Sequence, residues 1–147
     1  MTYFEWVEYF HMLQTSPMDY SLLEKAENKK LLGGEYVLSK LVNHVINTIK
    51  VRLTKSYSTC LNRIYKSNND INTISLDLIN FKKEKKFIEK IVNLSIFDEE
   101  LKNIFINSIN NLFNDMSNIL KGSVTYVDND GELTSVFEKI MLSSVEE

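Results

Sequence analysis

The chain has 147 residues, of which 44% are apolar and 25% charged, with one cysteine, one proline, four glycines and a formal net charge of −3. This length fits one domain with a substantial core, and the composition excludes wholesale disorder and a collagenous chain. One cysteine excludes an intrachain disulfide framework and a multi-cysteine zinc site. The uncharged stretches are too short for a transmembrane span, and the start of the chain lacks the basic region of a signal peptide. We therefore expect a single cytoplasmic domain over residues 1–147, with no membrane association.

Residue usage is also skewed, with 16 asparagines and 14 isoleucines against a single alanine. Helical proteins usually contain many alanines, because alanine is the best helix former. The skew is typical of an AT-rich genome, such as that of a low-GC bacterium or one of its phages.

The first expected helix begins after Thr2 and runs to about Gln14. Thr2 and Glu5 form a capping-box pattern, in which a hydroxyl at the N-cap precedes a carboxylate by three residues. Pro17 then ends the helix. Its apolar stripe contains aromatic side chains of the kind that anchor protein interfaces, and the candidate partner-binding residues are Tyr3, Trp6, Phe10 and Leu13. Two interpretations remain open: residues 1–15 form a core helix of the fold, or they dock separately against a partner or a second copy of the chain.

Two further helices are expected before residue 67. Ser21 and Glu24 repeat the capping-box pattern, and the pair Gly33–Gly34 is suited to end that helix. Apolar residues then recur with helical spacing from about Glu35 to Lys66. Residues 54–59 form the weakest part of this long helix, where a kink or break is expected.

A turn of polar residues, Ser67–Asp70, precedes a fourth helix that is expected from about Ser75 to Leu94. The fifth helix is expected to begin near Asp98, where carboxylates favour the positive end of the helix dipole, and to end at Lys121–Gly122.

The last segment, residues 123–147, has two open interpretations. Residues 124–127 are β-prone and Asp128–Gly131 has turn composition, so residues 133–137 can return as the second strand of a hairpin. The alternative is a short helix from about Glu132 to Leu142. The predicted fold is all-α: an elongated bundle of four to five helices, with either this small C-terminal β-hairpin or the short helix.

The sequence offers no strong catalytic or metal-binding motif. Glu8 and His11 form a single Glu-x-x-His pair, whereas a di-metal helical centre needs two such pairs and further glutamates. Cys60 lies on an apolar stripe, where a cysteine acts as a small hydrophobe. Asp128–Gly131 lacks the flanking ligands of a calcium loop. We expect a protein that is not an enzyme and has no metal or cofactor.

Charge is strongly segregated along the chain. Residues 1–49 have four basic and six acidic residues, residues 50–90 have ten and four, and residues 91–147 have three and ten. The corresponding net charges are −2, +6 and −7. The basic residues of the central segment fall on faces of the third and fourth expected helices, close to Tyr57 and Tyr65, which offer stacking platforms. The candidate nucleic-acid-binding residues are Arg52, Lys55, Arg63, Lys66, Lys82, Lys83, Lys86 and Lys90.

These cations have three interpretations: a surface that is solvated or neutralised by the acidic C-terminal third, a nucleic-acid surface, or a surface for an acidic protein. Arginine, which suits phosphate best, occurs only twice. The leading functional prediction is a small non-enzymatic interaction or regulatory protein that acts through helix faces, with a protein partner or a second copy of itself. The aromatic first helix and the acidic C-terminal third are its expected binding surfaces. The alternative is a helical nucleic-acid-associated protein that uses the basic faces of residues 50–90.

Overall fold

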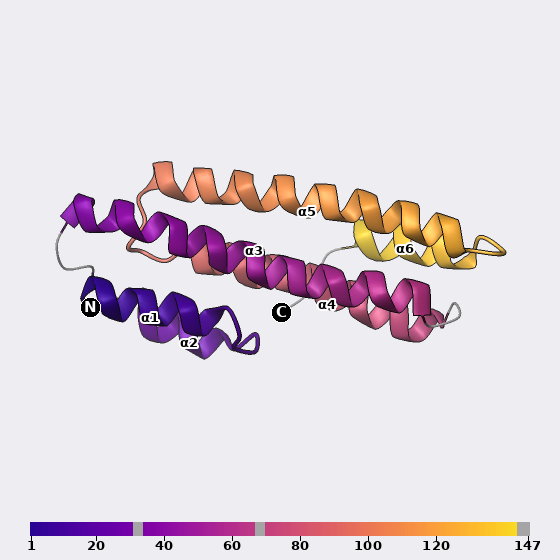
Figure 1. Ribbon diagram of the computed structural model, residues 1–147, viewed down its shortest axis with the longest axis horizontal. Coiled ribbons are helices and arrows are strands. Elements are labelled where there is room, and N and C mark those ends of the chain that lie inside the picture. Colours follow the sequence, from indigo (N-terminus) through magenta and orange to yellow (C-terminus); the bar gives the residue numbers. More distant parts are fainter. Residues whose placement is uncertain (31–33, 67–69, 144–147) are drawn as a thin grey trace. The chain divides into compact units, whose positions relative to one another are not determined.

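The computed structural model describes residues 1–30, 34–66 and 70–143, and these residues form six helices and no strand. The helices are α1 (Tyr3–Leu13), α2 (Tyr20–Glu27), α3 (Gly34–Lys66), α4 (Ile71–Val92), α5 (Glu99–Val127) and α6 (Glu132–Leu142) (Figure 1). The all-α prediction is therefore confirmed, although the six helices of the described residues exceed the four to five expected.

The helices group into two compact units. Unit 1 comprises Met1–Arg52 and Lys86–Asn110, and unit 2 comprises Leu53–Lys85 and Asn111–Glu147. Unit 1 contains α1 and α2 with the first part of α3, and unit 2 contains α6 with the later part of α5. Three helices, α3, α4 and α5, contribute residues to both units.

The predicted start of α1 is confirmed at atomic detail. The Thr2 hydroxyl accepts a hydrogen bond from the Glu5 backbone N–H at 3.2 Å, and the Glu5 carboxylate accepts one from the Thr2 N–H at 3.1 Å. Hydrogen bonding of the Glu5 carboxylate to the Thr2 backbone, and then to the Thr2 side chain, lowers the pKa of Glu5. The signal is contained within four residues, which is why the sequence alone located it.

The second helix begins and ends earlier than predicted. Its N-cap is Asp19, whose carboxylate accepts the Ser21 N–H at 3.0 Å, so Ser21 is not the cap. The helix ends at Glu27. It is bonded to α1 through the Tyr9 hydroxyl, which donates to the Leu22 carbonyl at 2.9 Å. Of the two glycines that were predicted to end this helix, Gly33 lies outside the described residues and Gly34 begins α3.

The long helices differ from the predictions mainly at their ends. Helix α3 continues through residues 54–59, so the expected break is absent from this described stretch. Helix α4 begins at Ile71, four residues before the predicted Ser75, because Asp70 accepts hydrogen bonds from the Thr73 hydroxyl and N–H. Residues 67–69 of the predicted turn lie outside the described residues.

The predicted C-terminal hairpin is wrong, and its helical alternative is confirmed. Helix α5 passes Gly122 and ends at Val127, and α6 then runs from Glu132 to Leu142, so it folds back beside the end of α5 (Figure 1). The β-prone segment remains helical because Val124, four residues after buried Leu120, is itself completely buried. The turn is held by Asp128, whose carboxylate accepts the Thr134 N–H at 2.9 Å.

Two glycines give a test of this corrected C-terminal structure. Gly122 is exposed within α5 and a Cβ there would meet nothing within 4 Å, whereas Gly131 has a φ of 82°. Gly122→Ala should therefore raise the free energy of unfolding by about 0.5–1 kcal/mol, since alanine restricts the unfolded chain. Gly131→Ala should lower it by about 1–2 kcal/mol, because a Cβ disfavours the left-handed conformation. Urea denaturation measures both, and a loss of stability in Gly122→Ala would contradict the extended α5.

Each unit has an aromatic centre in its core. In unit 1, Trp6 stacks on Phe10 with a centroid distance of 5.8 Å, and Phe97 contacts Phe10 at 6.1 Å. In unit 2, Phe81 stacks on Phe113 at 4.6 Å. These rings are almost wholly removed from water, so the tryptophan and most of the phenylalanines serve the core.

Candidate functional site

The four aromatic and apolar residues expected to bind a partner lie in unit 1. Trp6, Phe10 and Leu13 are completely buried. Tyr3 is half-buried, and its hydroxyl lies 3.3 Å from Nε2 of His44 on α3. The structure therefore brings these residues together in a core and does not present them on a surface, as the core-helix interpretation of residues 1–15 expects.

Arg52, the first of the eight candidate cations, is also inside unit 1. Its side chain is only 6% exposed, and its guanidinium donates to the carbonyls of Leu13 and Ser16, the latter at 2.8 Å. The guanidinium carbon also lies 4.6 Å from the centre of the Phe87 ring. A cation at the carboxyl end of a helix is favourable, so Arg52 fastens the end of α1 to α3. This placement does not offer it to an external phosphate.

The lysines of α4 divide between two settings. In unit 2, the Lys82 ammonium donates to the carbonyls of Ile140, Met141 and Ser143 at the end of α6. Partial burial, with the nearby charge of Lys85, lowers the pKa of Lys82. In unit 1, the Lys90 ammonium lies 5.5 Å from the centre of the Tyr20 ring, and Lys86 is half-buried. Lys83, in unit 2, is exposed.

The remaining candidate cations lie on one face of α3 in unit 2. Lys55, Arg63 and Lys66 are all exposed. A shallow depression of about 280 Å³ opens on this face and is lined by Thr59, Asn62, Arg63 and Lys66. The lining residues follow the i, i+3, i+4, i+7 spacing of a single helix face. We call this surface the α3 basic face and define it by five residues: Lys55, Thr59, Asn62, Arg63 and Lys66.

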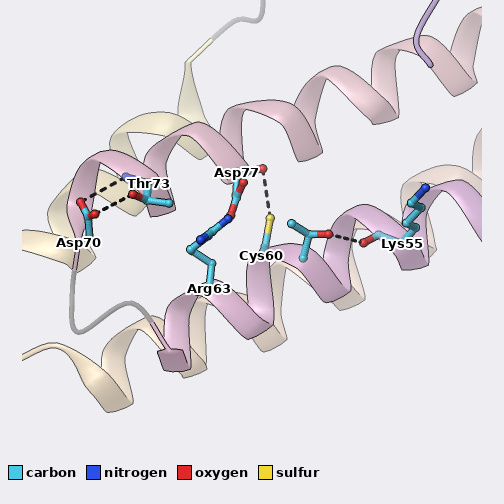
Figure 2. A network of polar contacts seen from close by, with 7 residues as sticks. Lys55, Cys60, Arg63, Asp70, Thr73 and Asp77 are labelled. Carbon is cyan, nitrogen blue, oxygen red and sulfur yellow. Dashed lines mark hydrogen bonds and ion pairs between the residues drawn. The ribbon is translucent and has the colours of Figure 1, made fainter.

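Arg63 is oriented by a carboxylate from α4. Its Nε–H donates to Asp77 at 2.9 Å, while the Arg63 side chain remains 46% exposed and that of Asp77 only 13% (Figure 2). The Cys60 thiol donates to the Asp77 backbone carbonyl at 3.2 Å, so α3 and α4 are joined at two adjacent points. The Asp77 carboxylate thus fixes the guanidinium at the edge of the depression and offsets part of its charge.

Two exposed tyrosines, Tyr65 on α3 and Tyr126 on α5, lie next to each other in unit 2. The Tyr65 hydroxyl donates to the Ser123 hydroxyl of α5 at 3.1 Å, and the Tyr65 and Tyr126 rings have a centroid distance of 6.5 Å. Tyr65 is 53% exposed and Tyr126 is 83% exposed. Tyr57, the other expected stacking platform, is half-buried. The sequence did not indicate Tyr126, because its neighbour on α3 is 61 positions away in the chain.

The described residues offer little to a nucleophilic or metal mechanism. Burial, and then the charge of Asp77, raise the pKa of the Cys60 thiol to about 12, so the thiolate form is scarce at neutral pH. Among residues 1–30, 34–66 and 70–143, no group of three or more His, Cys, Asp or Glu side chains is placed to hold a metal ion. Within the same ranges, no helix has both the length and the apolar content that crossing a bilayer requires.

The chain matches no protein-family model, no curated protein and no solved structure. The α3 basic face is therefore considered on its own residues: three exposed cations on one helix face, two of which line a depression.

Proposed function

We propose that this protein is a small non-enzymatic interaction protein that acts through an exposed helix face, and that this face is the α3 basic face. Its ligand is a polyanion, because the surface combines three cations with the side-chain amide of Asn62, while the Thr59 hydroxyl donates to the Lys55 carbonyl. Such a protein regulates or assembles its partner by binding to it, and it needs no catalytic group.

One observation carries the proposal: Lys55, Arg63 and Lys66 remain exposed on one face of α3, where Arg63 and Lys66 line a solvent-open depression. Arg52 and Lys82, in contrast, are bonded to backbone carbonyls within the fold. A cation that already satisfies helix-end carbonyls has little left to offer a ligand. The exposed three are spread over about 16 Å of helix at 1.5 Å per residue, so an extended chain of negative charges can contact all of them. The buried aromatic face of α1 gives the protein no comparable exposed surface.

The test uses heparin as the polyanion and calorimetry at about 50 mM salt, where electrostatic binding is strong. Lys55→Gln combined with Lys66→Gln should weaken binding about five- to tenfold, as expected for the loss of two exposed charge contacts. Lys29→Gln combined with Lys50→Gln is the matched control, since both lysines are exposed and both belong to unit 1. The control variant should bind nearly as the native protein does.

Asp77→Asn is expected to change heparin affinity in the opposite direction. The asparagine oxygen can still accept the Arg63 N–H, but the negative charge beside the depression is gone, so heparin affinity should rise about two- to threefold. Equal losses in the two double-lysine variants would show that binding follows net charge and would overturn the proposal. Absence of binding by the native protein at low salt would overturn it as well.

A further inference from the structure

We infer that the polyanion taken by the α3 basic face is a single-stranded nucleic acid, with its phosphates on Lys55, Arg63 and Lys66 and a base on the Tyr65–Tyr126 pair. This inference rests on the proposed function and adds the chemical class of the ligand. It depends on the two exposed rings, which a surface for negative charge alone does not need.

The tyrosine pair adjoins the α3 basic face through Asn62. Tyr65 follows Asn62 by three residues, so these two side chains are neighbours on the surface of α3. The hydrogen bond from Tyr65 to Ser123 holds the first ring against α5. The two ring planes make an angle of 55°, and Tyr126 is 83% exposed, so it retains most of its surface for contact with a ligand.

Base stacking explains why a single strand fits better than the other polyanions. An unpaired base has two free faces, and stacking on an aromatic side chain is worth about 1–3 kcal/mol per base. In a duplex these faces are covered by neighbouring base pairs, and an acidic peptide has carboxylates with no base to stack. The distance of about 16 Å along α3 corresponds to roughly five nucleotides at the 3.4 Å rise of one stacked strand. Asn62 lies between the cations, where its side-chain amide can donate to sugar or phosphate oxygens.

The experiment measures fluorescence anisotropy with a labelled oligothymidylate, a duplex of the same length and a polyglutamate peptide. The single strand should bind most tightly. With three phosphate contacts, its affinity should fall about 20-fold between roughly 50 and 200 mM salt, since each contact adds about 0.7 to the slope. In Lys55→Gln combined with Lys66→Gln, the same change of salt should lower affinity only about two- to threefold.

Tyrosine variants separate stacking from charge. Tyr126→Leu should weaken oligothymidylate binding about fivefold or more and leave heparin binding unchanged, because it removes only the stacking surface. Its exposure makes a folding defect unexpected, and circular dichroism checks this. Tyr36→Leu is the matched control: it removes a tyrosine ring that is 71% exposed but belongs to unit 1, and it should retain single-strand affinity to within about twofold.

The outcomes distinguish this inference from the proposed function. If duplex or polyglutamate binds at least as tightly as the single strand, or if Tyr126→Leu changes nothing, the inference is overturned. The proposed function then still stands provided that heparin binding depends on Lys55 and Lys66. If no polyanion binds at low salt, both fail.

Discussion

Phe10→Ala should lower the free energy of unfolding by about 3–5 kcal/mol, the usual cost of removing a fully buried phenylalanine and leaving a cavity. Phe10 is completely buried and its ring contacts both Trp6 and Phe97. Typical domains are stable by only about 5–15 kcal/mol, so the variant should unfold at a much lower urea concentration. Far-UV circular dichroism during urea denaturation measures the change without relying on Trp6 fluorescence.

Phe4→Ala is the matched control on the same helix. Phe4 is 75% exposed, so its removal should change the free energy of unfolding by no more than about 0.5 kcal/mol. The comparison decides between the two interpretations of residues 1–15. A core helix predicts the large difference between the two variants. A helix whose aromatic face is exposed and binds a partner predicts a small change in the free energy of unfolding at both positions.

The second large effect is expected at Arg52. Arg52→Met should lower the free energy of unfolding by about 2–4 kcal/mol, because the carbonyls of Leu13 and Ser16 lose a buried, charged donor. Methionine keeps a similar length of apolar chain, so most of the loss reflects the hydrogen bonds and not the packing. Lys55→Met, three residues further along α3 and exposed, should stay within about 0.5 kcal/mol.

Arg52→Met also separates structure from binding. Under conditions where the variant is folded, its heparin affinity should equal that of the native protein, since Arg52 is engaged within unit 1. A stable Arg52→Met variant that binds heparin weakly would show that Arg52 contributes to ligand binding and would contradict its purely structural role.

The features that the sequence predicted well are those whose signals are local. Thr2 and Glu5 lie within one turn of each other, and their capping box is present. The hairpin prediction failed because the β propensity of residues 124–127 is weaker than the burial that α5 gains from Leu120 and Val124 at helical spacing. Gly122 is tolerated inside α5, at a cost that neighbouring packing offsets.

In the candidate site, too, the sequence predicted the local arrangement and missed the contacts between distant residues. Helical spacing correctly predicted that Lys55, Arg63 and Lys66 share a face of α3. It did not separate them from Arg52 or Lys82, because the carbonyls that engage those two are 36–39 and 58–61 positions away in the chain. Only the folded structure shows which cations are already engaged by such distant partners.

The most direct test of the α3 basic face is an amide NMR titration of the full chain with heparin at about 50 mM salt. We predict that the largest chemical-shift changes fall within residues 55–66, with smaller changes near Asp77 and Tyr126. Changes that are confined to residues 82–90 or to α1, or a spectrum that heparin leaves unchanged, would contradict the account.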